Sequence, residues 1–301
     1  MSEADAFTPE QSVHLSDAIM RAVRRVSPDT RFVALSVWRG TPDLFECALN
    51  PGNRRPQRPI DMIAYHFYAY PAAELFKYES YSLSAVGVWQ YTFFDQADAF
   101  IDKVRYVEAI RKRLSPSTRV NLNELGTYAP GDFDANATDT GIPQDYWSLS
   151  GAVFAYLYVE LAKQGIDIVA QSLLAAGPGM APGNTMLNWQ TGQPNARYRV
   201  LKLLKDNFGA GDRMIATTID QRLDVLNPDL AAQAFVTSKG KKILLINKRW
   251  RALQVDLSKA GTAVRLGAID DQSEDRPPQG IEKIDGPVNL KPFATVVVSV
   301  E

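Results

Sequence analysis

Short apolar runs alternate with longer segments of helical character across residues 1–209 of this 301-residue chain. The runs have the length of strands and are bounded by turn residues, and they cover residues 31–38, 60–68, 118–128 and 166–173. Strands and helices that alternate in this way form right-handed βαβ units, in which the strands lie parallel and the helices cover the sheet. We therefore predict an α/β fold built on a parallel sheet.

Helices are predicted between these strands. Thr8-Pro9-Glu10-Gln11 has the form of a capping box, and the helix that follows is expected to bury one apolar face. That face consists of Leu15, Ile19, Ala22, Val23 and Val26. Further helices are predicted at about residues 95–114, 146–163 and 195–208, whereas residues 39–56 are turn-rich and at most weakly helical, and residues 71–94 are predicted to be a long aromatic loop.

The pattern changes after residue 209. Short strands with alternating polarity are predicted at residues 214–219, 232–237, 243–248, 252–257, 264–269 and 293–300. Ser238-Lys-Gly240-Lys has the composition of a hairpin turn between two of them. These strands predict an antiparallel β-sandwich, so we expect two domains, residues 1–209 and residues 210–301.

Composition excludes several classes of function. The net charge of -1 gives no electrostatic reason to expect nucleic acid or an anionic membrane as a partner. With one cysteine, Cys47, and only two histidines, the chain has neither a disulfide framework nor a cysteine- or histidine-rich metal site, and we expect no metal or organic cofactor.

Membrane and secretion signals are also missing from the sequence as written. No apolar run approaches the roughly 20 residues of a membrane span, and the acidic start Met-Ser-Glu-Ala-Asp does not resemble a secretion signal. The sequence as written therefore predicts a cytoplasmic product, and a secreted or periplasmic location for a longer parent protein stays open.

One carboxylate stands near the end of a predicted strand. The run Thr118–Tyr128 carries Glu124 shortly before Gly126, where we expect the strand to break. Glu124 should then emerge at the carboxyl edge of the sheet, which is the edge where α/β enzymes place their reacting groups. Taken alone, such a glutamate is usually an ordinary solvated residue, so its role depends on the neighbouring strands.

Those neighbours carry a resemblance. A strand that ends in His66-Phe-Tyr68, then a helix, then a strand that ends in Glu124-Leu-Gly-Thr resembles strands six and seven of the clan A glycoside hydrolases, in which the seventh strand of a (β/α)8 barrel ends in the nucleophilic glutamate. The β-module, opened by Asn207-Phe-Gly-Ala-Gly-Asp212 and closed by Pro292-Phe-Ala-Thr-Val-Val-Val, looks most like that of family 39, the β-xylosidase and α-L-iduronidase type. Similarity to family 79 stays open.

The clan also places its acid/base glutamate in an Asn-Glu pair at the end of strand four, and Asn123-Glu124 matches that pair as well. Four more strand-helix units would then have to follow before the β-module, but only one does, built on residues 166–173. Glu124 therefore fits strand seven, and the chain is expected to contain strands five to eight of a partial (β/α)8 TIM barrel with their flanking helices.

The resemblance then places the acid/base at Glu3, although the preceding residue is Ser2 rather than asparagine. Because strands one to four have no counterpart in the sequence, it also implies the C-terminal half of a barrel, from an N-terminally truncated protein. The two outer strands of such a half-barrel would be open and apolar, and a homo-oligomer would bury them.

The implied activity is retaining hydrolysis of O-glycosidic bonds in β-linked glycosides or oligosaccharides, with a carbohydrate substrate and Glu124 as the attacking carboxylate. Hydrogen-bond donors would keep Glu124 charged and oriented, and flat aromatic faces would stack on sugar rings. The candidate donors are His66, Tyr68 and Asn123, and the candidate aromatic platforms are Trp38, Trp147 and Trp189. Two alternatives stay open: a non-catalytic carbohydrate-binding protein and an inactive fragment of a glycosidase.

Overall fold

The computed structural model describes residues 7–38, 40–57, 59–71, 86–138, 142–177, 179–220, 228–269, 282–284 and 286–301. The chain forms two compact units that interleave along the sequence. The first contains Met1–Tyr68, Ala99–Leu125 and Gln164–Gln171, and the second contains Ala69–Asp98, Gly126–Lys163 and Ser172–Glu301. Glu3 lies outside the described residues.

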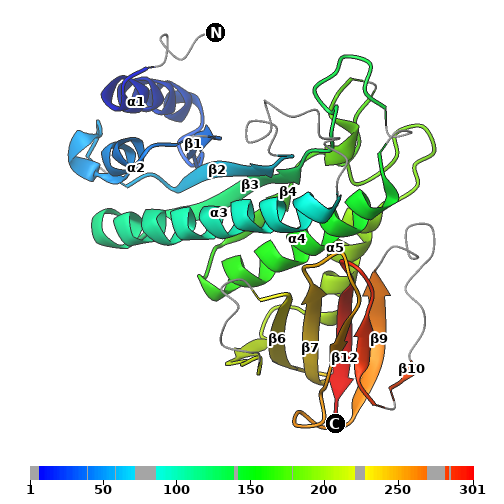
Figure 1. The fold of residues 1–301 in the computed structure, drawn as a ribbon. Helices are drawn as coiled ribbons and strands as arrows, with labels where there is room; N and C mark the ends of the chain where they lie inside the picture. Colours follow the sequence, from blue (N-terminus) through cyan, green and yellow to red (C-terminus); the bar gives the residue numbers. More distant parts are fainter. Residues whose placement is uncertain are drawn as a thin grey trace. The chain divides into compact units, whose positions relative to one another are not determined.

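A four-stranded sheet has the strand order β1-β2-β3-β4 (Figure 1). Its strands are Val33–Val37, Met62–Ala69, Arg119–Thr127 and Ile168–Gln171. β1 pairs in parallel with β2, and β3 pairs in parallel with β4. The backbone N–H of Arg119 donates to Asp61 at the start of β2, and that of Tyr128 donates to Ala69 at its end, so β2 and β3 also run in the same direction. The predicted parallel sheet is confirmed.

Aromatic side chains pack two helices, α2 (Pro42–Leu49) and α3 (Val86–Leu114), against one face of β2. The ring centroids of Phe45 and Tyr65 lie 5.2 Å apart, and those of Phe67 and Phe100 lie 4.7 Å apart in a stacked pair. Side chains alternate between the two faces of a strand. Tyr65 and Phe67 therefore face the helices, which turns His66 and Tyr68 toward the opposite face.

Two helix predictions were wrong. Residues 42–49, predicted to be at most weakly helical, form α2, which starts with a proline at its first turn and buries Phe45 and Leu49. α3 begins at Val86 rather than near Asp95, so part of the predicted aromatic loop is helix, while residues 72–85 of that loop lie outside the described residues. The first turns of α3 are apolar on several sides, so no amphipathic stripe marks them.

The capping box at the start of α1 (Pro9–Val26) is confirmed. The backbone N–H of Gln11 donates to Thr8 Oγ1 at 3.2 Å, and the N–H of Thr8 donates to Gln11 Oε1 at 2.9 Å. The predicted buried face of α1 is wrong, however. Val13, Asp17 and Met20 are buried, whereas most of the predicted face is exposed: Leu15, Ile19, Val23 and Val26.

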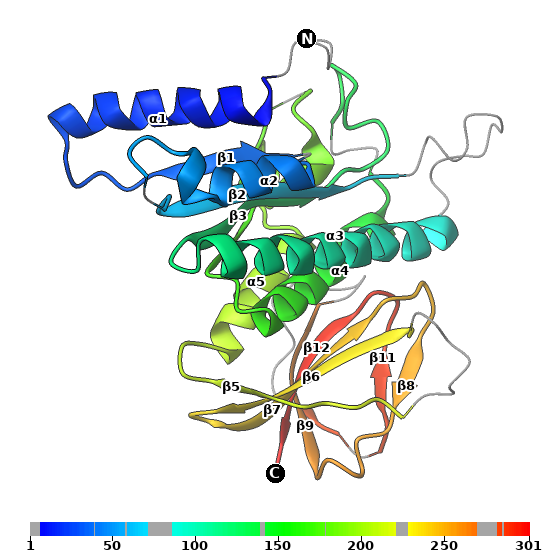
Figure 2. The same ribbon diagram turned by 90° about the vertical axis from the view of Figure 1, so that its left-hand side faces the viewer.

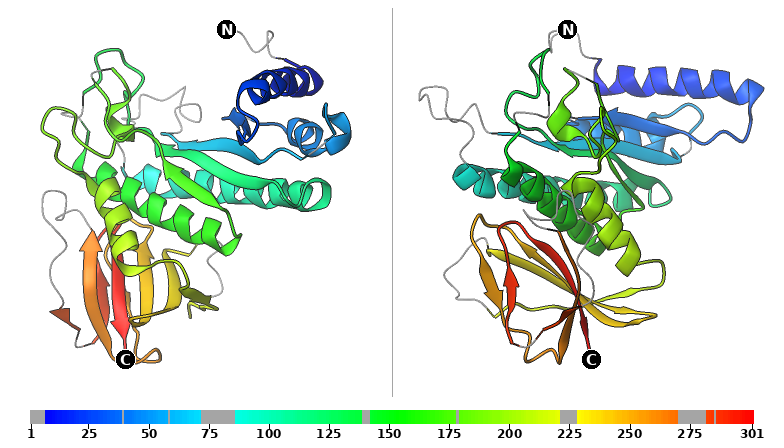
Figure 3. Two further views of the ribbon diagram at one scale, coloured as in Figure 1. Left: turned by 180° about the vertical axis from the view of Figure 1, so that it is seen from behind. Right: turned by 90° about the vertical axis from the view of Figure 1, so that its right-hand side faces the viewer.

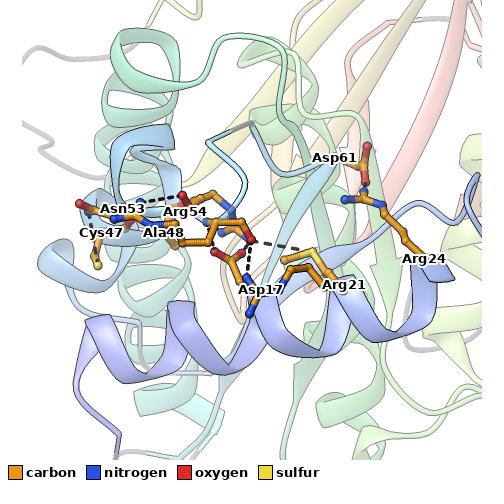
Figure 4. A network of polar contacts seen from close by, with 10 residues as sticks. Asp17, Arg21, Arg24, Cys47, Ala48, Asn53, Arg54 and Asp61 are labelled. Atoms are coloured by element: carbon orange, nitrogen blue, oxygen red, sulfur yellow. Dashed lines mark hydrogen bonds and ion pairs between the residues drawn. The ribbon is translucent and has the colours of Figure 1, made fainter.

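A buried ion pair explains this rotation of α1 (Figure 4). Asp17 accepts a hydrogen bond from the Arg54 guanidinium at 2.6 Å and another from the backbone N–H of Arg55 at 2.5 Å. Asp17 and Arg54 are only 4% and 3% exposed. Burial lowers the pKa of Arg54 from its ordinary value, and the charge of Asp17 opposes that shift. Asp17 of α1 thus faces the residues that follow α2. α1 itself lies beside α2 (Figure 2).

β1 also differs from its prediction. Residues 31–38 form a continuous apolar run that predicts a fully buried strand, but of β1 only Ala34 is buried and Val33 is half exposed. β1 is an outer strand of the four-stranded sheet, so one of its edges lacks a strand partner among the described residues. This position accounts for the exposure.

The second unit contains two helices that pack against each other, α4 (Gln144–Lys163) and α5 (Ala196–Asn207). Both were predicted. Gly151 of α4 lies so close to Val200 and Ala196 of α5 that an added Cβ would meet them at 3.1–3.4 Å. The side chain of Asn195 caps α5 by accepting from the backbone N–H of Arg197 at 3.0 Å.

The second unit also contains an antiparallel β-module (Figures 2 and 3). Its six-stranded sheet has the order β10-β9-β12-β7-β6-β5, with β5 Arg213–Ile215, β6 Leu230–Thr237, β7 Gly240–Asn247, β9 Ala263–Ile269, β10 Glu282–Lys283 and β12 Thr295–Val300. A ribbon of β8 (Leu253–Val255) and β11 (Val288–Leu290) shares one apolar core with that sheet. The predicted hairpin turn joins β6 to β7, and β10 and β11 were not predicted.

Across the described ranges, no helix combines the length and the apolar character needed to cross a membrane.

Candidate active site

The face of β2 that points away from α2 and α3 carries His66 and Tyr68. Both positions are even-numbered in a strand whose odd-numbered aromatics pack on the helices, so the alternation of the strand sets their direction. The His66 side chain is 12% exposed and Tyr68 is 9% exposed. Both polar aromatic side chains are therefore largely buried.

An irregularity in β3 brings Glu124 to the same face. Leu122 pairs with Val169 of β4, but Leu125 pairs with Gln171, so β3 has one residue more than its partner between these two points. A bulge of this kind redirects side chains. It allows Asn123 and Glu124, which are neighbours in sequence, both to reach residues on the His66 side. β3 does not break at Gly126 as predicted but continues to Thr127.

Two side chains of β2 contact Glu124. The phenol of Tyr68 donates to Glu124 Oε2 in a short hydrogen bond, and His66 Nδ1 lies 3.3 Å from the same oxygen. The carboxylate itself remains 40% exposed. A donor to a carboxylate fixes its orientation. Both of these contacts engage Oε2 of Glu124.

β1 contributes further polar contacts to His66 and Asn123, through Ser36. Ser36 Oγ lies 3.2 Å from His66 Nε2, and Asn123 Nδ2 donates to Ser36 Oγ at 3.4 Å. β1 carries its own bulge between Ala34 and Val37, where Leu35 has a φ of 72°. Sequence analysis missed Ser36 because nothing distinguishes a serine inside an apolar run.

Trp38 lies just beyond β1, next to this cluster. Its ring meets that of Tyr68 edge-to-face at a centroid distance of 5.5 Å, and it is 42% exposed. It also lines an open cavity of about 400 Å³, together with Phe45, Lys103 and Tyr106. An exposed aromatic ring that contacts Tyr68 is suited to stacking on a sugar ring.

The remaining predicted residues fall elsewhere. Trp189 belongs to the second unit, in the segment between β4 and α5, and is 43% exposed. Trp147 was a wrong choice for a sugar platform, because it is 9% exposed in α4 and packs edge-on against Tyr146. The structure thus joins Glu124, His66, Tyr68, Asn123 and Trp38 in one cluster and leaves Trp189 and Glu3 as predictions.

Two loops of the second unit are tied together by a buried carboxylate that sequence analysis also missed. Asp132, which follows β3, accepts from the backbone N–H of Ala129 at 2.7 Å and from that of Gly183 at 2.8 Å. Burial raises the pKa of Asp132 to about 6, and the two backbone donors oppose that shift. A Cβ at residue 183 would lie 2.5 Å from the Ala129 side chain, so only glycine fits there.

The described residues contain no group of three or more histidine, cysteine, aspartate or glutamate side chains placed to hold a metal ion.

No known family model matches the sequence, and no curated protein is detectably similar to it. Solved structures do resemble it. One is a family 51 α-L-arabinofuranosidase from Bifidobacterium longum, with a TM-score of 0.61 at 11% identity, over 97% of this chain and 63% of that one. Another is a family 30 endoxylanase from Clostridium papyrosolvens, with a TM-score of 0.52 at 12% identity, over 100% and 63%.

A third similar structure is a family 44 xyloglucanase from Paenibacillus polymyxa, with a TM-score of 0.60 at 13% identity, over 97% of this chain and 61% of that one. All three are glycoside hydrolases. The chain shares their fold. It spans less than two thirds of the length of these enzymes, and sequence identities of 11–13% establish similarity of fold alone.

Proposed function

We propose that this chain is a glycoside hydrolase that cleaves O-glycosidic bonds with retention, through Glu124 as the nucleophile. The observation that carries the proposal is that Tyr68, by a hydrogen bond, and His66, at 3.3 Å, both contact one oxygen of Glu124 near the carboxyl end of a parallel strand. The fold supports it, because the similar solved structures are glycoside hydrolases. β-linked glycosides or oligosaccharides are the proposed substrates.

The geometry suits nucleophilic attack. A carboxylate nucleophile must keep its charge and present one oxygen to the anomeric carbon. Tyr68 and His66 contact Oε2, so the other oxygen is the one proposed to attack, and Trp38, which contacts Tyr68, is the proposed sugar platform. Asn123 precedes Glu124 in the sequence and adds a polar side chain to the same cluster, where it donates to Ser36.

The proposed assignment of strands follows the predicted order. β1 to β4 would be strands five to eight of a (β/α)8 barrel, residues 1–209 its C-terminal half, and residues 210–301 a β-sandwich domain of the family 39 type. Retaining glycosidases need a second carboxyl group about 5–5.5 Å from the nucleophile as the acid/base. Glu3 is the proposed acid/base, and Trp189 is a proposed further platform.

Turnover of aryl glycosides tests the proposal. The panel takes its sugars from the similar enzymes and from family 39: α-L-arabinofuranoside, β-xyloside, β-glucoside and α-L-iduronide. The expected result is turnover by the purified chain that is lost in Glu124→Ala and restored by added azide as a glycosyl azide of inverted configuration, because azide then replaces the missing carboxylate. Glu160→Ala, at an ion-paired helix position, is the matched control and should keep full activity.

Turnover that survives in Glu124→Ala would reject Glu124 as the nucleophile. A folded wild-type chain that binds oligosaccharides but turns none over would instead favour a carbohydrate-binding protein, an alternative supported by the exposed ring of Trp38. In that case Glu124→Gln should leave binding intact. Absence of both binding and turnover would favour an inactive fragment.

We also propose that the chain forms a homo-oligomer. Among the described residues, β1 and β4 each have a single strand partner, and the outward face of α1 is apolar and exposed. Parallel strands with free edges tend to acquire partners. A second copy would cover both features.

A further inference from the structure

We propose that Ser36 is a positioning residue that selects the tautomer of His66, so that the imidazole presents a proton to Glu124. The inference rests on the proposed role of Glu124, but its first readout does not require turnover. Its basis is a continuous series of polar contacts that runs from β3 through β1 to β2 and back to β3: Asn123 to Ser36, Ser36 to His66, and His66 to Glu124.

The direction of each hydrogen bond follows from the chemistry of the groups. An ionised carboxylate only accepts, so the proton between His66 Nδ1 and Glu124 Oε2 must belong to Nδ1. Asn123 Nδ2 only donates, so Ser36 Oγ accepts from it. The hydroxyl of Ser36 keeps its own proton, and in the proposed arrangement it donates that proton to His66 Nε2, 3.2 Å away. The opposite arrangement, in which a protonated Nε2 donates to Ser36, belongs to the other tautomer.

In its neutral form, His66 would carry its proton on Nδ1 in this series. In a neutral imidazole one nitrogen donates and the other accepts, and the partner of one nitrogen decides the state of the other. The His66 side chain is 12% exposed, so its ring has limited access to water as a substitute partner. Without the Ser36 hydroxyl, only the Glu124 carboxylate would favour an unprotonated Nε2, and the ring would lose the donor that satisfies that nitrogen.

The backbone of β1 supports a dedicated role for Ser36. Between Ala34 and Val37, β1 contains one residue more than β2, because these residues pair with Ile63 and Tyr65. Leu35, within this bulge, has a φ of 72°, a conformation that costs free energy for a non-glycine residue. The bulge lets Leu35 pack against the apolar cluster of Val13, Cys47 and Ala48 while Ser36 reaches His66.

Imidazole ¹⁵N NMR gives the decisive test. The chain has only two histidines, so a ¹⁵N-histidine-labelled sample yields two ring patterns, and His66→Gln assigns them. At about pH 8, above the ordinary titration range of histidine, the wild-type His66 pattern should show a protonated Nδ1 and an unprotonated Nε2. Ser36→Ala should shift it toward a protonated Nε2, Ser36→Thr should retain the wild-type pattern, and His14 serves as the internal reference.

Kinetics provides the second arm. Ser36→Ala should lower kcat about tenfold with KM changed by less than about twofold, because His66 acts through the orientation of Glu124 rather than on substrate binding. Ser36→Thr should keep wild-type kcat. Thermal melting of each variant separates this effect from loss of fold.

The two arms distinguish the inference from the proposed function. If the chain has no turnover but the tautomer depends on the Ser36 hydroxyl, the inference stands and the glycosidase proposal falls. A wild-type spectrum with Nε2 protonated overturns the inference even if Ser36→Ala does not fold, and so does a Ser36→Ala spectrum that matches the wild type.

Discussion

The phenol of Tyr68 contacts one oxygen of Glu124, and the other oxygen is the one proposed to attack the substrate. Tyr68→Phe removes the phenol that donates to Oε2 and keeps the ring that contacts Trp38. If Glu124 is the nucleophile, kcat should fall by about 10- to 100-fold, with a change in unfolding free energy below about 1 kcal/mol. Tyr198→Phe, which alters an exposed tyrosine of α5, is the control and should behave as wild type. Equal activity of the two variants would argue against a role for the phenol.

The buried carboxylate of Asp132 gives a prediction about pH. Because burial raises the pKa of Asp132 from 3.8 to about 6, the folded state binds the proton more tightly than the unfolded state does. The stability from this group is present below about pH 4 and is lost as pH rises through about 6. The quantity to follow is the difference in unfolding free energy between wild type and Asp132→Asn. This difference should fall by about 2–3 kcal/mol as the pH rises from about 4 to about 6, and should stay level at higher pH.

Denaturant titrations at several pH values measure this difference. Asp134→Asn, an exposed aspartate of the same loop, is the control and should show no such window. A difference between wild type and Asp132→Asn that does not depend on pH would mean that Asp132 keeps an ordinary affinity for its proton in the folded chain.

One buried ion pair, between Asp17 and Arg54, helps to hold α1 on the rest of the first unit. Asp17→Ala leaves the Arg54 guanidinium buried without its partner, so the free energy of unfolding should fall by about 3–5 kcal/mol. The control is Asp102→Ala, which breaks the Asp102–Arg105 pair on α3, where the two side chains are 72% and 59% exposed. That change should cost less than about 0.5 kcal/mol. Similar losses in the two variants would contradict a special role for the buried pair.

Helices and strands were predictable where local chemistry dictates them. The capping box fixed the start of α1, and strand-length apolar runs located all four parallel strands. The buried face of α1 was not predictable, because it depends on Arg54, which is distant in sequence and contributes a charge rather than an apolar contact. The spacing of the apolar residues in α1 predicted a buried face, but the structure leaves that face exposed.

The candidate cluster was predictable only in part. Strand ends and a family resemblance led to Glu124, His66 and Tyr68, whose contacts the structure describes. Ser36 could not be found in this way, because a bulge shifts the alternation of side chains by one position and leaves no mark in the pattern of apolar residues. The same kind of bulge in β3 places Glu124 and Asn123 on one side, contrary to simple alternation.

The chain as a whole carries an apolar surface that folding of the described residues does not cover. Leu15, Ile19 and Val23 are 45%, 52% and 37% exposed along one side of α1, and Val33 of the outer strand β1 is 50% exposed. An apolar stripe next to an unpaired strand edge favours self-association. We expect a concentration-dependent rise in mass above that of the 33.4 kDa chain in sedimentation experiments.

Ile19→Glu tests whether the stripe on α1 mediates this association. Because Ile19 is already 52% exposed, the substitution should change the free energy of unfolding by less than about 0.5 kcal/mol while shifting the equilibrium toward the monomer by tenfold or more. Ile215→Glu makes the same chemical change at a 40% exposed residue of the β-module and should leave association unchanged. A wild-type chain that stays monomeric, or an Ile19→Glu variant that associates as wild type does, would remove the stripe as an interface, because charge at its centre must oppose any apolar contact made there.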